Sequence, residues 1–147
     1  MKIEDSFTVN APIETVWEYL LNIEEMSKCV PGVSGVEALG GDDYEGQLVV
    51  KVGPISAAFS GKVKLTQTEA PHLIAAEVSG DDRASATAVK ATFQSTLAEI
   101  EGGTQVTYMM DMNLRGRLAQ FGSAVINATA KKMTAEFAKN LRNAIES

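Results

Sequence analysis

Acidic pairs, a single thiol and a single imidazole are the side chains of this sequence that could do chemistry. Two carboxylates at a suitable separation can serve as general acid and base, and the sequence holds the pairs Asp42–Asp43 and Asp81–Asp82. Both pairs stand beside glycines in expected turns, where acids are favoured for backbone reasons. Cys29 has no histidine or lysine at catalytic spacing, and His72 follows Pro71 in another turn. These residues therefore predict no nucleophile and no acid–base pair.

The sequence also contains no motif typical of a phosphate-binding or metal-binding site. Gly53–Pro54 and Gly102–Gly103 read as turns, because no lysine followed by serine or threonine completes a phosphate-binding loop. One histidine and one cysteine leave few ligands for a transition metal. The inward positions of the expected strands carry almost no ionisable groups, whereas acid–base catalysis needs one placed in the pocket. We therefore expect no catalytic residue, no metal and no cofactor.

The charge balance excludes other classes of function. The formal net charge is −6 and the pI about 4.8, so the chain lacks the cationic surface that nucleic acids and anionic membranes require. The N-terminal residues Met1–Asp5 precede no apolar run of the kind found in a signal peptide. The single Cys29 fits a reducing compartment. A cytoplasmic location, with at most transient membrane contact, is the expectation.

One long helix over residues 117–146 is the element that must position any site. The stretch contains no proline, and its apolar side chains recur every three or four residues, as on one face of an α-helix. This expected stripe consists of Leu118, Phe121, Val125, Thr129, Met133, Phe137, Leu141 and Ile145. Because an isolated amphipathic helix is marginal in water, the stripe needs a cover of similar length.

The rest of the chain reads as that cover. A strand over residues 2–9 precedes a helix that starts at Asn10–Pro12, and a short helix follows over residues 23–28. The period then changes to two, which is typical of half-buried strands, and the longest strand is expected to contain a bulge or bend. The expected strands are 33–39, 44–52, 55–66, 74–78, 84–100 and 106–114, with a turn at Gly80–Asp82. The sequence thus predicts an α+β fold in one domain over residues 1–147, with a curved seven-stranded antiparallel sheet gripping the long helix.

Small residues are frequent at the inward positions of these elements. They are Ala57, Gly61, Ala76, Gly80 and Ala91 on the strands, with Ala128 and Ala130 on the helix. Small side chains that face one another leave room, which a close-packed interior does not tolerate. Either the sheet collapses onto the helix or a ligand fills the gap, and the residues alone leave both open.

If a ligand fills the gap, its contacts should be apolar and adaptable. Methionines suit an irregular hydrophobic molecule, although each can equally be ordinary core, and so can the tryptophan. The candidate ligand-binding residues are Trp17, Met26, Phe59, Phe93, Met110, Met112, Val125 and Met133. The segment Met26–Val33 is expected to form a lid, with Cys29, Val30, Pro31 and Gly32 at the entrance.

Arg115 and Arg117 are candidates for contact with a partner. They stand at the N-terminal end of the long helix, where positive charge is mildly unfavourable. Either an acidic partner or a lipid headgroup offsets that effect, or the two side chains are simply solvated.

The order of elements resembles the helix-grip topology of the START and birch-pollen-allergen superfamily, also called SRPBCC. Local motifs narrow the resemblance to the CoxG-like family, which is named after a component of carbon monoxide dehydrogenase, over essentially the whole chain. The motifs are Cys29–Val33 (CVPGV), Tyr44–Gly46 (YEG), Lys51–Ile55 (KVGPI), Phe59–Gly61 (FSG) and Gly116–Gly122 (GRLAQFG).

The resemblance implies a non-enzymatic accessory protein. Members of the family are associated with molybdenum hydroxylases of the carbon monoxide dehydrogenase type, with attaching them to the membrane or passing electrons to quinone. The superfamily fold holds a lipid, an isoprenoid or another apolar molecule between sheet and helix, so the resemblance favours a cavity. Two rivals remain: a cyclase- or hydrolase-like enzyme, with an ionisable group inside the cavity, and a cavity-less module that docks through its outer sheet or its Arg115–Arg117 corner.

Overall fold

The computed structural model describes residues 1–146 and shows seven strands, three α-helices and one 3₁₀-helix. The chain begins with one strand and two short helices, continues through six strands and ends in a long helix. The elements are β1 (Lys2–Val9), α1 (Ile13–Leu21), α2 (Ile23–Ser27), β2 (Val33–Gly40), β3 (Asp43–Val52), β4 (Ile55–Glu69), β5 (Leu73–Asp82), β6 (Thr87–Ile100), β7 (Gly103–Arg115), η1 (Arg117–Phe121) and α3 (Gly122–Glu146).

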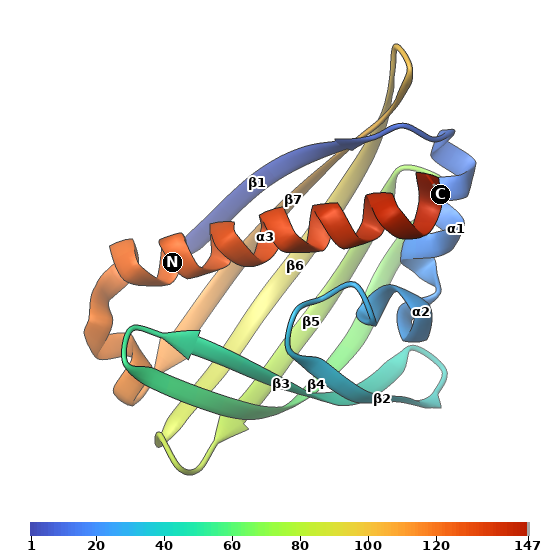
Figure 1. The fold of residues 1–147 in the computed structure, drawn as a ribbon. Helices are drawn as coiled ribbons and strands as arrows, with labels where there is room; N and C mark the ends of the chain where they lie inside the picture. Colours follow the sequence, from blue (N-terminus) through green and yellow to red (C-terminus); the bar gives the residue numbers. More distant parts are fainter. Residues whose placement is uncertain (147) are drawn as a thin grey trace.

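The strands form one antiparallel sheet in the order β1-β7-β6-β5-β4-β3-β2. Each strand from β2 to β7 pairs with its neighbour in sequence, and β1 joins at the far edge beside β7. Helix α3 crosses one face of this sheet, and α1 and α2 lie near its C-terminal end (Figure 1). This is the helix-grip architecture that the sequence predicts, and the fold class is confirmed.

The two faces of the sheet differ as the period-two pattern predicts. We call the face towards α3 the inner face and the opposite one the outer face. On β4 the inner positions Ala57, Phe59 and Leu65 are buried, while Ser60 and Lys62 on the outer face are exposed. A sheet that packs against an apolar core on one side and faces water on the other needs this alternation.

The C-terminal half of α3 is fixed to the sheet by directional contacts. The Arg142 Nε donates to the Thr8 carbonyl over 2.8 Å, and the ring of Phe137 meets that of Phe7 edge-on at 5.9 Å. The Asn10 backbone N–H donates to the Glu146 carboxylate over 3.3 Å. These contacts hold this half of the helix against β1.

The prediction of one continuous helix over residues 117–146 is wrong at its start. Residues Arg117–Phe121 form a 3₁₀-helix, and α3 begins after a break at Gly122, which has φ +84°. Such a left-handed conformation favours glycine, and it turns the chain between the two helices. The buried face is also rotated from the expected stripe, because Ile126 is 7% exposed while Val125 is 36% exposed.

Two predictions about the strands are also wrong. Gly80–Asp82 is not a turn, since β5 continues to Asp82 and pairs with Thr87, and the turn follows after it. No bulge interrupts β6, which keeps an unbroken register with both neighbours. Register shifts lie instead on β4, where an extra residue stands between Leu65 and Gln67, and at two places on β2, between Ser34 and Glu37 and between Ala38 and Gly40.

Candidate ligand-binding site

The buried apolar residues form two separate clusters, one towards each end of α3. The first joins α1, α2 and the C-terminal part of α3 to the sheet, and includes Trp17, Leu97 and Leu141. The second lies under the start of α3 and includes Phe59 and Ile126. Neither cluster contains Val78, Ala91 and Met110 of the sheet or Ala130 and Met133 of α3. We call these five residues the central layer.

The central layer is less tightly covered than its position predicts. Val78, Met110, Ala130 and Met133 are half-buried, although they occupy inner-face or helix positions between two packed clusters. Side chains of a close-packed interior leave no such access to water. The centre of the sheet–helix layer is therefore the part of the interior where an apolar molecule could displace water.

A cleft of about 390 Å³ opens beside the second cluster, between the end of β7 and the start of α3. At this edge of β7 the pairing with β1 ends at Lys2–Asp111, and Met1 adds two hydrogen bonds to the backbone of Met112. The size of the cleft is within the range of small-molecule sites. It is lined by Met1, Asp111, Met112, Asn113, Leu114, Ala119, Gly122, Ser123 and Ile126.

The residues predicted to bind a ligand are only partly brought together. Met110 and Met133 belong to the central layer, Phe93 packs against the first cluster next to Met110, and Met112 lines the cleft. Trp17 and Met26 lie in and against the first cluster, and Phe59 is buried in the second. Val125 is exposed on α3.

The segment predicted as a lid is anchored at the opposite end from the cleft. Cys29 is 4% exposed, and its carbonyl accepts a hydrogen bond of 2.9 Å from the Asn140 side chain of α3. The Gly32 carbonyl accepts from the Val49 N–H over 2.9 Å, which ties the segment to β3. The intervening Val30 and Pro31 are half-buried.

The thiol of Cys29 lies beside a phenol rather than beside a base. The Tyr19 hydroxyl is 3.6 Å from Cys29 Sγ. Burial, followed by this contact, raises the pKa of Tyr19 to about 12. The phenol therefore stays neutral and packs as part of the first cluster's rim.

Oxygen-bearing side chains on the inner face were missed as site residues by the sequence reasoning. Asp5, Tyr108 and Ser95 stand opposite one another on β1, β7 and β6, and we call them the polar row. The Tyr108 hydroxyl bonds to Thr134 Oγ of α3 at 2.5 Å, and its ring stacks on Phe93 with centroids 6.0 Å apart. The signal in the sequence was Asp5, which breaks the apolar alternation of the first strand.

Tyr108 has its pKa raised above the usual value of a tyrosine. Burial is the main cause and the nearby Asp5 carboxylate adds to it, while the bond to Thr134 acts in the opposite direction. The phenol is therefore neutral at physiological pH and takes part only in hydrogen bonding.

A second buried polar group surrounds Asp82, at the end of β5. Its carboxylate accepts from Ser85 Oγ at 2.9 Å, from the Ala84 N–H at 3.1 Å and from the Ala58 N–H at 3.3 Å. These bonds, led by that from Ser85, hold the pKa of Asp82 below its usual value. The contacts to Ser85 and Ala84 fix the β5–β6 turn and the contact to Ala58 ties it to β4, so this carboxylate is structural.

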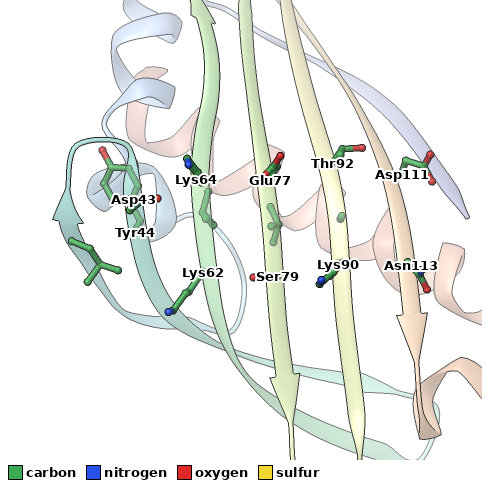
Figure 2. A pocket seen from close by; sticks show the side chains of 14 residues that line it. Asp43, Tyr44, Lys62, Lys64, Glu77, Ser79, Lys90, Thr92, Asp111 and Asn113 are labelled. Atoms are coloured by element: carbon green, nitrogen blue, oxygen red, sulfur yellow. The ribbon is translucent and has the colours of Figure 1, made fainter.

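The outer face carries a wider groove of about 800 Å³ (Figure 2). Two lines of outer-face side chains cross the strands there. They are Lys64–Glu77–Thr92–Asp111 and Lys62–Ser79–Lys90–Asn113. Within residues 1–146 ion pairs join only Met1 to Asp111 and Lys28 to Glu25, so the groove lysines are free. The full lining is Leu39, Asp43, Tyr44, Lys62, Val63, Lys64, Glu77, Val78, Ser79, Lys90, Ala91, Thr92, Asp111 and Asn113.

The two arginines proposed for partner contact are exposed and lie outside this groove. Arg115 ends β7 and Arg117 begins η1, so both stand at the corner from which α3 starts. The side chains that the structure describes form no group of three or more His, Cys, Asp or Glu able to hold a metal ion. No helix within residues 1–146 is both long and apolar enough to cross a membrane.

Comparison with solved structures shows where this fold recurs. A conserved protein from Geobacillus kaustophilus is similar with a TM-score of 0.90 and 23% identity, covering 99% of this chain and 95% of that one. A START superfamily protein from Mycobacterium smegmatis gives 0.76 and 14%, covering 99% and 97%. An aromatase/cyclase, Zhui, from Streptomyces sp. R1128 gives 0.70 and 18%, covering 99% and 93%. These likenesses establish the START-like fold.

Comparison with curated protein sequences finds no match. Residues 6–146 match the family of CoxG, a carbon monoxide dehydrogenase component, which confirms the resemblance carried by the sequence motifs. The chain therefore belongs to the CoxG family.

Proposed function

We propose that the protein binds an apolar small molecule, a lipid or a quinone, between the inner face and α3. The observation that carries this proposal is the central layer, in which four of five apolar side chains are half-buried although they lie between two packed clusters. Each methylene that leaves water on entering such a layer contributes roughly 0.8 kcal/mol. In this proposal Met110 and Met133 adapt to the ligand, with Phe93 and Met112 at its edges.

The biological role that fits this binding is that of an accessory protein to a molybdenum hydroxylase of the carbon monoxide dehydrogenase type. The family description supports that association. We place the protein in the cytoplasm, with at most transient contact with the inner side of the membrane, where a quinone or lipid would be collected. In this role the protein carries a molecule and does not transform it.

Filling the central layer tests the proposal directly. Ala91→Phe places a ring where the ligand would lie, whereas Ala88→Phe adds the same ring to the outer face of the same strand. Native mass spectrometry and titration with quinones and lipids, followed by Trp17 fluorescence, should show saturable binding to the wild type and to Ala88→Phe. Binding should be lost in Ala91→Phe. Absence of any bound apolar mass in the wild type would refute the proposal.

A second candidate is an enzyme of the cyclase or hydrolase type, and Asp5 beside Tyr108 is the observation that favours it. A carboxylate and a neutral phenol on an inner face could move a proton on a bound carbonyl compound. The test is to recover the ligand after incubation and compare its mass and its NMR spectrum with those of the input, since moving a proton within the ligand leaves its mass unchanged. A changed mass or spectrum that Asp5→Asn abolishes would favour the enzyme over the carrier.

A third candidate is docking of the hydroxylase on the outer face, favoured by the size of the groove there. Lys62 and Lys90 flank Ser79 and form no ion pair within residues 1–146, and both could meet acidic side chains of an enzyme. If docking occurs there, Lys62→Glu with Lys90→Glu should weaken binding to a purified hydroxylase and leave ligand binding unchanged.

A further inference from the structure

We propose that the molecule held between the sheet and α3 carries a hydroxyl group, which donates a hydrogen bond to the Tyr108 oxygen. This inference rests on the proposed binding function and names the polar chemistry of its ligand. It is carried by the direction of the hydrogen bonds that join Tyr108, Thr134 and the helix backbone.

The direction follows from counting protons. Thr134 Oγ lies 2.9 Å from the Ala130 carbonyl oxygen, which can only accept, so the single hydroxyl proton of Thr134 is used there. The 2.5 Å contact between Thr134 and Tyr108 must then be made with the proton of Tyr108. The Tyr108 hydroxyl therefore has no proton left for a ligand, but its oxygen can still accept one.

The neighbouring side chains of the polar row also favour a ligand that donates a hydrogen bond. Asp5 is an acceptor, and one of its carboxylate oxygens already takes the Ser6 N–H at 2.8 Å. Ser95 is a hydroxyl that can rotate to donate or to accept. Among the described residues no donor reaches the Tyr108 oxygen. A ligand hydroxyl can thus donate to the Tyr108 oxygen, whereas a carbonyl, which only accepts, finds no free proton there.

The position of Tyr108 connects this acceptor to the apolar central layer. Its ring stacks on Phe93, and Phe93 stands opposite Met110 on the adjacent strand. Tyr108 remains half-buried beneath α3 rather than sealed by it. An apolar body lying along Met110 and Met133 would therefore bring a terminal hydroxyl towards the polar row. A phenol, a quinol or an aliphatic alcohol has this shape.

The experiment compares 4-hexylphenol, 4-hexylanisole and 4-hexylacetophenone by isothermal titration calorimetry. They share an apolar body and offer, respectively, a donor, a capped oxygen and a carbonyl. The wild type should bind the phenol roughly 3- to 10-fold more tightly than the anisole, the range expected for one net hydrogen bond. Tyr108→Phe should bring the two affinities together, whereas Tyr44→Phe, which removes a phenol elsewhere on the inner face, should keep the wild-type ratio.

Thr134→Ala provides a readout that a merely structural role would not give. Removing the Thr134 oxygen frees the Tyr108 proton, so binding of the ketone should improve relative to the wild type. Thermal unfolding of each variant checks that it is folded. An unchanged phenol-to-anisole ratio in Tyr108→Phe, or a wild type that prefers the ketone, would overturn the inference while leaving the carrier function intact. Failure of all three compounds to bind the wild type would instead count against the carrier function.

Discussion

The hydrogen bonds of the Asp82 carboxylate stabilise the folded chain at pH values above the pKa that this group has in the unfolded chain. The folded pKa is depressed, so this stabilisation is fully present above the ordinary value of 3.8 and is lost as the pH falls through the folded pKa. Urea unfolding between pH 7 and pH 2.5 should show Asp82→Asn less stable than the wild type at neutral pH, with the gap closing in acid. The exposed neighbour Asp81→Asn should behave as the wild type throughout. A gap that does not narrow as the pH falls below 3.8 would mean that packing, not charge, is responsible.

Ser85 tests the same group without removing a charge. Its hydroxyl lies 2.9 Å from both the Asp82 carboxylate and Thr87 Oγ, and it is 4% exposed. Ser85→Ala should therefore cost about 1–2 kcal/mol of unfolding free energy, as expected for a buried hydrogen bond. Equilibrium denaturation measures this value. A cost below about 0.5 kcal/mol would show that water replaces the hydroxyl.

The positions of single residues in the structure show which placements the sequence could predict and which it could not. The pair Asp81–Asp82 predicts a turn because acids favour turns, yet pairing with Thr87 and the N–H groups of Ala58 and Ala84 keeps Asp82 in the strand. The alternation of the last strand predicts Tyr108 on the inner face, where it lies. Its partner Thr134 could not be predicted, because it depends on where the helix crosses the sheet.

At the scale of elements, the β7–α3 connection contrasts two glycines with positive φ. A Cβ on Gly116 would overlap the Ala86 carbonyl of the β5–β6 turn, whereas one on Gly122 would meet no atom within 4 Å. Gly122→Ala should therefore cost about 1 kcal/mol from backbone strain alone. Gly116→Ala should cost about 3 kcal/mol or more, because the turn must also move. Equal losses in denaturant titrations would refute the role of the close approach.

The segment Met26–Val33 is an element whose proposed gating can be measured. Opening it breaks the bond from Asn140 to the Cys29 carbonyl, so Asn140→Ala should speed ligand association about 5-fold, which corresponds to about 1 kcal/mol. Stopped-flow fluorescence of Trp17 reports the rate. Ser123→Trp, which narrows the cleft at the other end of α3, is the matched variant. If only Ser123→Trp changes the rate, the cleft is the entrance and the segment is not a lid.

Periodicity predicted the existence and order of the elements, but not their junctions. The alternation over residues 55–66 is inside β4, and the helical spacing after Gly122 is inside α3. The break at Gly122 and the extra residue on β4 were missed, since both arise where distant segments meet. The apolar stripe shifted from Val125 to Ile126 for the same reason, because the break resets the direction of the helix.

At the scale of the whole molecule, the sequence left collapse and cavity equally open. Small residues at inward positions predicted room, but whether the helix would close it depends on where α3 is fastened. It is fastened at its C-terminal end by Arg142 and Phe137 and at its start by Ile126, and the Thr134–Tyr108 hydrogen bond ties it to β7 in between. The stretch between these points spans Ala130 and Met133, where the two clusters fail to meet. The separation of the clusters is thus a property of the assembled fold.

This separation predicts how a ligand should stabilise the protein. A molecule in the central layer would join the two clusters, so at a ligand concentration 100-fold above Kd the stability should rise by about 2.7 kcal/mol. Hydrogen exchange should slow most in α3 around Ala130 and Met133, since both ends of the helix are already packed. Ala91→Phe should show neither effect with ligand, because its ring occupies the same space. Protection confined instead to outer-face residues such as Lys62 and Lys90 would place the ligand in the outer groove and contradict an interior site.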